Sequence, residues 1–584
     1  MKNYVVYHLH TDLSNGTTTL DSVNKYKQYV DKAKELGMTA MAFSEHGNIF
    51  EWLHKKEYIE SNGMKYIHGI EAYVTLGGKE RDNYHVGLYA KNYDGFIEIN
   101  KLSSIAFSRD DIHFYFSPRI TFDELLSTSD NVIVTTACLG NILYSADEIT
   151  KDRFIEFLSN NKHRCFLEIQ HHNVKEQIEY NKYLYIISKE HDIPLITGTD
   201  THALNKDYMI GRAILQSRKN IHFSNEDAWD MTFKSYDELV ECYKIQSSLP
   251  ENVYLEAIDN TNRFADMVES FNLDRSFKYP KLYNNPEQKI DELLSEYRIK
   301  KDLDSKENVF EYDERIEYEL EVYKQQDAID FLLLEENIKR AMRDEGKFCG
   351  YSRGSVSGSI IAWLLGITDV DSIKYKLYFE RFMNPERVSL GDIDTDWGTT
   401  DRDRVKEYIH IDMKDKGFKV YTAEIITFNT IALKGAIKDV AGGLREMSDA
   451  KLQSIGYPKS QIPTLEETNE ISKEIESKED FYRKKYPELF KYVDMLFGVI
   501  VSVGTHPAGT VVSPIDLDST VGTFRLNSCD YPIVQLNMKE VDSLNYVKLD
   551  ILGLDNVGII NNACKLAGID RLIPDNMDFG MRKR

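Results

Sequence analysis

Residues 4–10 read YVVYHLH, a short apolar run that ends in two histidines. In a β-strand, side chains two positions apart leave the same face, so His8 and His10 are expected to point the same way. Residues 193–202, IPLITGTDTH, end in the same manner with Asp200 and His202. Four metal-binding side chains are therefore expected to meet at one end of a sheet.

Between these two segments, short β-like runs alternate with helical patterns up to about residue 210. This alternation predicts βα units that close a parallel sheet or a barrel. More metal-binding residues stand at or near the ends of these runs: His46, Glu71, His85 and Cys138. Imidazole, carboxylate and thiolate donors together favour Zn²⁺, Mn²⁺ or Fe²⁺, and such a cluster activates water for attack on a phosphate ester. Taken singly, each histidine is more simply explained as a structural polar residue, but that explanation weakens for the whole set.

The segment FERFMNPERVSLGDIDTDW, residues 379–397, carries acids at alternate positions. These acids are Asp392, Asp394 and Asp396. In a strand this period points all three carboxylates to one face, where their repulsion is tolerable chiefly if cations bind, and it suits a two-magnesium site for phosphoryl transfer. An EF-hand also begins with DxDxD, but Trp397 stands where that loop needs glycine and Asp403 where it needs glutamate.

Upstream, residues 348–371 begin FCGYSRGSVSGS and continue into an apolar run. The glycines and serines predict a loop whose backbone N–H groups approach an anion, and the run predicts a helix whose N-terminus favours phosphate. Arg353 adds a planar positive group. A flexible linker is the alternative on composition alone, because no P-loop pattern is present.

Composition excludes several classes of protein. The net charge of −23 argues against a protein that coats nucleic acid non-specifically. The apolar stretches are far shorter than the roughly 20 residues that cross a bilayer, so no membrane span is expected. The N-terminus carries no signal region, and the six cysteines form no CxxC pair, which suits reduced thiols. We therefore expect a cytoplasmic protein.

The N-terminal motifs resemble, in type and order, those of the polymerase and histidinol phosphatase (PHP) domain. They are HxHT, EHG, GIEAYV, H, ACLGN and TDTH. The resemblance implies a distorted βα barrel with a multinuclear metal site. The implied ligands are His8, His10, His46, Glu71, His85, Cys138, Asp200 and His202. The aspartate usual after HxHT has no counterpart at the expected spacing, where Thr17 stands, and Asp12 and Asp21 are the candidates to replace it. Glu45 takes the place of the aspartate usual before the next histidine.

Three further histidines are not expected to bind metal directly. His172 matches a family histidine and is expected at the rim of the site or behind its ligands, where hydrogen bonds orient metal-bound groups. His163 and His171 are expected to be structural.

Six further motifs resemble, in sequence and in order, those of C-family DNA polymerases, the family of the bacterial DNA polymerase III alpha subunit. They are GYSRGSVSGS, LGITDVD, FERFMNPERVSLGDIDTDW, EIITFNTIALKGAIKDVA, GTHPAGTVVSP and VKLDILGL. The resemblance covers most of residues 1–570. It implies that Asp394, Asp396 and Asp550 bind the two Mg²⁺ ions, and Asp392 matches an additional acid of the family. The implied nucleotide and phosphate contacts are Arg353, Gly354, Ser355, Lys548, Arg387 and His506, and Lys434 and Lys438 are candidates for DNA phosphates.

The resemblance also implies the architecture, an α/β multidomain chain in which a βα barrel precedes a mixed-sheet polymerase palm with an inserted helical thumb. The expected limits are 1–210 for the PHP barrel, 211–290 for its helical end and a linker, 291–440 and 499–570 for the palm, 441–498 for the thumb, and 571–584 for the start of the fingers or a tail.

The implied function is DNA-directed DNA polymerisation, with primer-template DNA and deoxynucleoside triphosphates as substrates. The PHP domain is a candidate 3′–5′ exonuclease. The alternative is a PHP phosphoesterase or exonuclease with an inactive palm. Family members continue for several hundred residues beyond the third aspartate, so a phage-type, split or truncated member is expected. A separate C-terminal polypeptide is then expected to supply the fingers and the clamp-binding segment.

Overall fold

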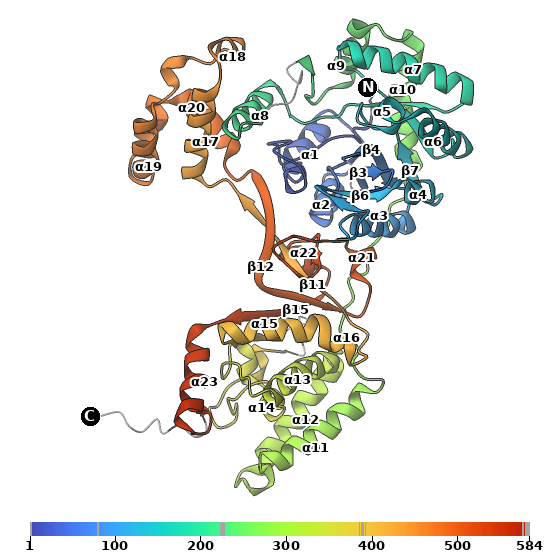
Figure 1. The fold of residues 1–584 in the computed structure, drawn as a ribbon. Coiled ribbons are helices and arrows are strands. Elements are labelled where there is room, and N and C mark those ends of the chain that lie inside the picture. Colours follow the sequence, from blue (N-terminus) through green and yellow to red (C-terminus); the bar gives the residue numbers. More distant parts are fainter. Residues whose placement is uncertain are drawn as a thin grey trace. The chain divides into compact units, whose positions relative to one another are not determined.

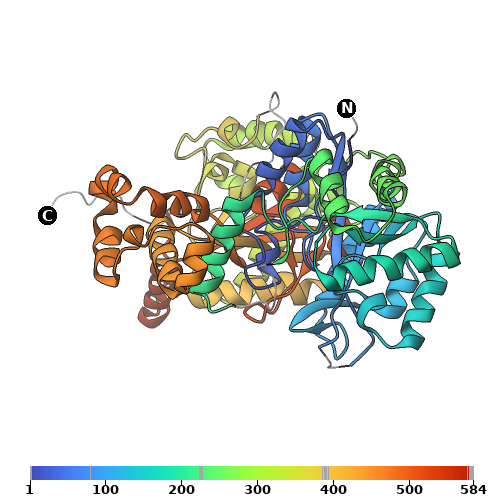
Figure 2. The same ribbon diagram turned by 90° about the horizontal axis from the view of Figure 1, so that it is seen from above.

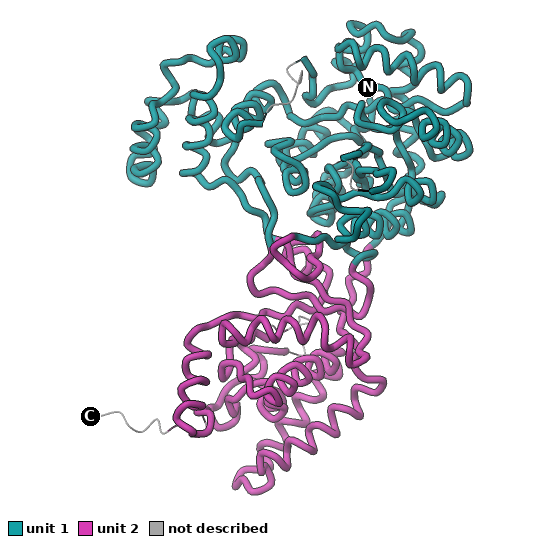
Figure 3. Tube along the Cα trace, in the orientation of Figure 1, with its two compact units in different colours: residues 1–272, 427–504, 518–526 teal, residues 273–426, 505–517, 527–584 magenta. Residues whose placement is uncertain are grey.

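The structure, a computed structural model, describes residues 3–78, 81–221, 228–384, 386, 391, 393–574 and 577 of the 584-residue chain. The chain divides into two compact units, coloured separately in Figure 3. Unit 1 comprises residues 1–272, 427–504 and 518–526, and unit 2 comprises residues 273–426, 505–517 and 527–584. The finer domain limits expected from the sequence stay a prediction.

A seven-stranded sheet forms the centre of unit 1 and has the order β5-β6-β3-β4-β7-β8-β9 (Figure 1). Its strands are β3 (Gly69–Thr75), β4 (Tyr84–Ala90), β5 (Phe114–Tyr115), β6 (Ser117–Thr121), β7 (Val132–Thr135), β8 (Cys165–Gln170) and β9 (Leu195–Gly198), while β1 (Ala40–Ala42) pairs with β2 (Lys65–Ile67). Isolated bridges join Leu9 to Thr201, Val6 to Met41 and His46 to Glu71. Through the N-terminal segment and β1, these bridges connect the end of the sheet at β9 with β3 and so close the barrel. The α/β fold and the distorted barrel predicted from the sequence are confirmed.

Two details of the barrel differ from the prediction. Residues 4–10 contribute isolated bridges rather than a regular strand. In addition, β4 runs antiparallel to both β3 and β7. Only residues 76–83 separate β3 from β4, and a parallel pair needs a crossover of a dozen or more residues.

Ten helices of the described N-terminal region surround or extend this sheet. They are α1 (Tyr26–Glu35), α2 (Trp52–Ser61), α3 (Tyr93–Ala106), α4 (Phe122–Leu126), α5 (Ile142–Ser145), α6 (Glu148–Asn160), α7 (Lys175–His191), α8 (Lys206–Arg218), α9 (Tyr236–Gln246) and α10 (Glu251–Asp266). Most alternate with the strands along the chain, as βα units require.

A helical insertion occupies the sequence between two strands of the second sheet. It consists of α17 (Leu433–Glu446), α18 (Asp449–Ser454), α19 (Leu465–Lys485) and α20 (Pro487–Leu496). Its apolar side chains share a buried core with Ile214 and Leu215 of α8, and Figures 1 and 2 show α8 beside these helices. At the closest approach, a Cβ on Gly443 would lie 2.1 Å from the Ile214 carbonyl oxygen, so a larger residue is excluded there. Across the described ranges, no helix combines the length and apolarity needed to cross a membrane.

The second sheet has the order β10-β15-β12-β11-β14-β13 and is mixed. Its strands are β10 (Asp394–Trp397), β11 (Tyr421–Thr430), β12 (Ile500–Ser513), β13 (Thr523–Phe524), β14 (Ile533–Val534) and β15 (Val547–Gly553). The α-helices that the structure describes in unit 2 are α11 (Pro286–Lys300), α12 (Val309–Gln325), α13 (Ile329–Asp344), α14 (Ile360–Leu364), α15 (Thr399–Glu407), α16 (Met413–Asp415), α22 (Met538–Ser543) and α23 (Asp555–Ala567). The short α21 (Leu517–Thr520) stands between β12 and β13. One apolar core joins α11 to α14 with the buried side chains of β10 and β15.

Candidate metal centres

All eight metal-binding residues expected in the barrel lie in unit 1, and Asp21 joins them. His8 and His10 come from the N-terminal segment, Asp21 from the loop before α1, His46 from the loop after β1, Glu71 from β3, His85 from β4, Cys138 from the loop after β7, and Asp200 and His202 from the segment after β9. Asp200 adopts a left-handed φ of 45°, a conformation that aspartate tolerates better than most residues do.

The donor atoms of these residues lie a few ångströms apart. Nε2 of His8 is 3.3 Å from Oδ1 of Asp200 and 3.4 Å from Oε1 of Glu71. Nδ1 of His85 is 3.1 Å from the same Glu71 oxygen and 3.3 Å from Sγ of Cys138. Glu71 and Asp200 thus face several imidazoles at once.

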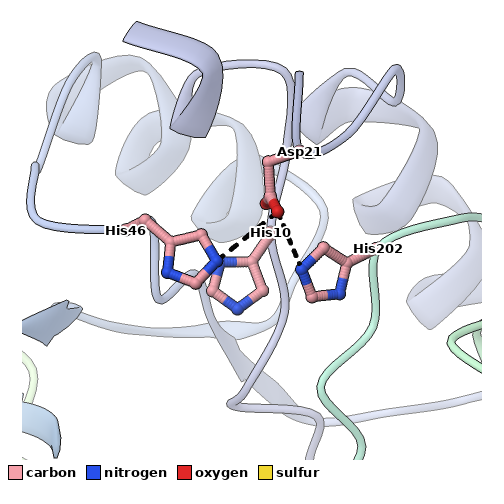
Figure 4. Close-up of side chains that lie close together, drawn as sticks. All are labelled: His10, Asp21, His46 and His202. Atoms are coloured by element: carbon pink, nitrogen blue, oxygen red, sulfur yellow. Dashed lines mark ion pairs between the residues drawn. The ribbon is translucent and has the colours of Figure 1, made fainter. Parts of the chain in front are cut away.

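Three groups within the cluster have donor atoms close enough to share an ion. They are His10, Asp21, His46 and His202; His8, His10 and Asp200; and His46, Glu71 and His85, with all donor atoms of a group within 4.8 Å of one another. Figure 4 shows the first group, in which Asp21 pairs with His46 at 3.5 Å and with His202 at 3.1 Å. Because His10 and His46 each belong to two groups, the cluster suits several ions held by shared ligands.

The buried polar atoms of the cluster fit divalent metal ions. Six of them form no hydrogen bond of good geometry with any described residue: His8 Nε2, His10 Nε2, Asp21 Oδ2, His46 Nδ1, Glu71 Oε2 and Asp200 Oδ1. Five of the six instead lie at ion-pair distance from one another, the closest pair being His46 Nδ1 and Glu71 Oε2 at 2.8 Å. Buried polar atoms that are poorly hydrogen-bonded are costly, and a bound cation removes that cost. Nitrogen, oxygen and sulfur donors in this mixture are those of Zn²⁺, Mn²⁺ or Fe²⁺ sites.

Burial and neighbouring charges set the ionisation of the cluster. Burial alone would raise the pKa of Asp21, but the imidazoles of His202 and His46 hold it well below its usual value. Burial lowers the pKa of His10 to about 4, and the charges of His46 and His202 add to this effect. Near neutral pH, Asp21 is therefore charged and His10 neutral, the states in which they bind a cation.

The two candidates for the missing aspartate occupy different places. Asp21 belongs to the first group of donors, whereas Oδ2 of Asp12 accepts a hydrogen bond from the Ile500 amide at 3.0 Å. Burial raises the pKa of Asp12 to about 7. Asp21 is therefore the better candidate ligand. Glu45 also lies outside the groups, because its carboxylate pairs with Lys55 at 2.8 Å and accepts hydrogen bonds from residues of the N-terminal loop.

Glu168 of β8 supports the cluster and was missed in the sequence analysis. Its Oε1 lies 2.6 Å from Nδ1 of His8, and its Oε2 accepts a hydrogen bond from Tyr7 Oη at 3.0 Å. A Cβ on Gly198 would lie 1.9 Å from Oε1, so only glycine leaves room for this carboxylate. The available signal was an acid inside the apolar strand CFLEIQ. Glu168 fixes the orientation of His8, as carboxylates behind metal-bound histidines do.

Replacing Glu168 with glutamine is expected to lower the metal affinity of the cluster roughly 10- to 100-fold, because His8 loses its charged hydrogen-bond partner. Titration of the metal-depleted variant with Zn²⁺ measures the change. Glu176→Gln, at an exposed position of α7, makes the same chemical change as a control. Unchanged affinity in Glu168→Gln would refute the positioning role.

The other three histidines lie outside the three groups. His172 is fully buried, and its ring centre lies 5.0 Å from that of Trp229. His171 is buried beside it, with ring centres 4.6 Å apart. His163 is exposed and pairs with Asp130 at 3.0 Å.

A second set of acids lies in unit 2. β10 and β15 are parallel neighbours, and their register sets Asp394 opposite Asp550. Along β10, Asp394 and Asp396 are partly exposed while Thr395 and Trp397 are buried, so the two aspartates share one face. Because residues 394–397 form a strand, the EF-hand alternative is wrong.

Two basic side chains face these carboxylates. Nη1 of Arg353 is 2.9 Å from Oδ1 of Asp396, and its Nε is 3.6 Å from Oδ2 of Asp394. Nζ of Lys548 is 3.7 Å from Oδ2 of Asp550, its neighbour on the same face of β15. The hydrogen bond from Arg353 to Asp396 raises the pKa of the guanidinium. The site thus combines three acids with two bases that also suit phosphate.

The glycine-serine loop lies against β10. The Gly350 amide donates to the Asp396 carbonyl at 2.6 Å. Gly354 has a φ of 74°, and a Cβ there would lie 3.5 Å from Asp394 Oδ2, so glycine suits both the turn and the close approach. Ser355 begins a 3₁₀ turn, Ser355–Gly358.

The sequence predicted that the helix after this loop would favour phosphate at its N-terminus, and this prediction is wrong. α14 is only five residues long. Its first amides, from Ile360 and Ile361, donate to the buried carboxylate of Glu319 at 3.0 and 3.1 Å. Glu319, on α12, therefore already occupies the positive end of the helix.

Other residues predicted to contact nucleotide or DNA either pair with groups outside the three acids or lie outside the described residues. Arg387 and Asp392 lie outside the described residues. His506 is on β12, where its Nδ1 accepts hydrogen bonds from the amides of Ala508 and Gly509 in the same strand. Lys434 of α17 pairs with Glu476 at 2.6 Å.

Two family models match the chain. Residues 7–186 match the PHP domain, and residues 282–553 match the bacterial DNA polymerase III alpha NTPase domain. The first match covers most of the barrel that carries the histidine cluster. The second covers Asp394, Asp396 and Asp550 together with the loop at Arg353.

Curated relatives align with nearly the whole chain. DNA polymerase III subunit alpha of Aquifex aeolicus is 29% identical over 95% of this chain and 51% of its own length. The corresponding subunit of Borreliella burgdorferi is 30% identical over 96% of this chain and 49% of its own length, and that of Helicobacter pylori is 30% identical over 97% and 50%. The chain thus spans about half the length of the curated relatives it matches.

Proposed function

We propose that this chain, which belongs to the bacterial DNA polymerase III alpha family, adds deoxynucleotides to the 3′ end of a DNA primer at Asp394, Asp396 and Asp550. The observation that carries the proposal is the parallel register of β10 and β15, which sets Asp394 opposite Asp550. Asp396 leaves the same face of β10. Three carboxylates on one partly exposed sheet face repel one another, and bound cations relieve this repulsion.

The three carboxylates fit two Mg²⁺ ions. When bound, the ions activate the primer hydroxyl and stabilise the leaving pyrophosphate. Arg353 and Lys548, which now pair with the acids, would turn to the triphosphate of the incoming nucleotide and offset its charge. Gly354 and Ser355 would contact the phosphates through their backbone, and Arg387 and His506 the nucleotide or the primer.

The barrel supports a second activity, hydrolysis of phosphodiester bonds at a 3′ end. Its support is the convergence of nine donors, most of them buried, from separate strands and loops. Zn²⁺, Mn²⁺ or Fe²⁺ bound there would supply activated water. The alternative in which the palm is inactive is not favoured, because the second set of acids and bases is complete among the described residues.

Resupplying single metals separates the two activities. The chain is first stripped of metal and then given Mg²⁺ alone or Zn²⁺ or Mn²⁺ alone, with labelled primer-template and labelled single-stranded DNA as substrates. Mg²⁺ is expected to favour nucleotide addition, and Zn²⁺, which binds imidazole and thiolate, to favour shortening from the 3′ end. Mn²⁺ also accepts carboxylates and is expected to support both activities. Shortening with no nucleotide addition under any metal would favour the phosphoesterase alternative.

We further propose that a polypeptide equivalent to the C-terminal half of the relatives, with fingers and a clamp-binding segment, docks on α23. The helix exposes apolar side chains that soluble surfaces usually hide: Ile559 is 63% exposed, Leu566 89% and the following Ile569 53%. Without such a partner to close over the nucleotide, the chain is expected to polymerise poorly.

The double substitution Ile559→Asp and Leu566→Asp is expected to weaken this docking at least tenfold, or about 1.4 kcal/mol, because it buries charges in the interface. Pull-down and equilibrium binding with a C-terminal polypeptide measure the effect. Phe310→Asp on α12, where the side chain is 80% exposed, is the matched control. Equal binding by the double variant would exclude α23 as the docking surface.

A further inference from the structure

A separate group of metal-binding side chains lies in unit 1. His171 directly follows β8, Asp230 lies in the segment before α9, and Cys242 is on α9. One donor atom from each residue lies within 4.8 Å of the others. None of the three belongs to the groups formed by the first cluster.

The imidazole of His171 is buried with few polar neighbours. The residue is 1% exposed, and neither ring nitrogen forms a hydrogen bond of good geometry with any described residue, although the backbone of Asp230 lies close enough to oppose the fall in the pKa of the ring. Burial holds the pKa of His171 well below its usual value, so the ring is neutral and has a lone pair to donate. A buried histidine of this kind indicates a missing partner.

The other two donors are oriented by their surroundings. Oδ1 of Asp230 accepts hydrogen bonds from Lys234 Nζ at 2.8 Å and Thr232 Oγ1 at 2.7 Å. These contacts hold the carboxylate in place and leave its second oxygen for an ion. Cys242 is a free, half-buried thiol. Lys234 also lies close to this group, and its ion pair with Asp230 at 2.8 Å offsets its repulsion of a metal ion.

We propose that His171, Asp230 and Cys242 bind a zinc ion that is distinct from the metals of the first cluster. Imidazole, carboxylate and thiolate are the three donor types of tetrahedral zinc, and the fourth position stays open to water. Zinc–ligand distances of roughly 2.0–2.3 Å require the donors to draw together slightly on binding. Binding releases the thiol proton to solvent, and the ion cross-links the end of β8 to α9.

His172 lies near both groups of donors. Its ring centre lies 4.6 Å from that of His171. Burial lowers the pKa of His172 to about 4, and the charges of Asp200 from the first cluster and Asp230 from this site oppose this effect. The two sites are therefore neighbours without shared ligands, and their ions can be counted separately.

Metal counting tests the site in the purified 584-residue chain. Asp230→Asn changes a half-exposed side chain and is expected to remove one zinc ion per chain when wild type and variant are loaded with Zn²⁺, desalted and analysed by mass spectrometry. His171→Asn should have the same effect. Asp237→Asn, at an exposed position of α9, is the matched control and should retain the full count. Full zinc content in both site variants would overturn the proposal.

Cobalt identifies the sulfur ligand directly. Thiolate bound to Co²⁺ gives a charge-transfer absorption band, and Cys138 of the first cluster also supplies a thiol. In a Cys138→Ser chain the band is therefore expected to persist, and adding Cys242→Ser should abolish it. Adding Cys529→Ser, at another half-buried thiol, should leave it unchanged. No band in Cys138→Ser, or a band that survives loss of Cys242, would refute the site whatever the activity of the first cluster.

Discussion

Asp396→Asn is expected to lower nucleotide addition by on the order of a thousandfold, or about 4 kcal/mol of transition-state stabilisation. The carboxylate lies beside Asp394 on one face of β10, and the amide that replaces it has no charge to hold a cation. The fold should persist, because loss of one charge relieves repulsion among neighbouring acids when no metal is bound.

Single-nucleotide addition to a labelled primer measures this effect, and thermal unfolding of the same preparations checks the fold. Asp403→Asn removes the same charge seven positions away, where the side chain is 75% exposed, and should leave the rate unchanged. If Asp396→Asn extends primers as fast as wild type, Asp396 has no part in the reaction.

His10→Ala is expected to remove at least one metal ion from the barrel and to lower shortening of single-stranded DNA on the order of a hundredfold or more. His10 belongs to two of the three donor groups, and its ring stacks between His46 at 4.1 Å and His202 at 4.5 Å. Among the three donor groups of the described residues, His46 is the only other residue that belongs to two groups.

Nucleotide addition should be little affected by His10→Ala, because Asp394 and Asp396 lie in the other unit. Metal content and both activities are measured on one preparation. His163→Ala, at an exposed histidine, is the control. If both activities fall equally, the barrel serves mainly as a structural support for the palm.

The parts of the fold with a local pattern were predictable. Alternating acids at 394 and 396 predicted a strand with both carboxylates on one face, and the structure forms β10 there. Histidines two positions apart at 8 and 10 likewise predicted a shared direction, and the two rings lie in one cluster. In each case the period of two residues is a property of extended backbone and needs no knowledge of distant contacts.

Features that depend on contacts between distant residues were not predictable. Asp21 joins the histidines from an irregular loop, where no periodicity indicates direction, so the sequence could name it as a candidate but could not choose between it and Asp12. Glu319 is 41 and 42 residues from the two amides it caps, so no local sequence pattern indicates that it occupies the N-terminus of α14. The packing of α17 against α8 similarly joins segments more than 200 residues apart.

The central proposal, nucleotide addition at Asp394, Asp396 and Asp550, is tested most directly by single-turnover primer extension. Excess 584-residue chain is mixed with labelled primer-template, Mg²⁺ and one deoxynucleoside triphosphate at a time. We predict slow addition of only the nucleotide complementary to the template, and none with Asp396→Asn. No addition of any nucleotide by the wild-type chain, or equal addition by the variant, would contradict the proposal.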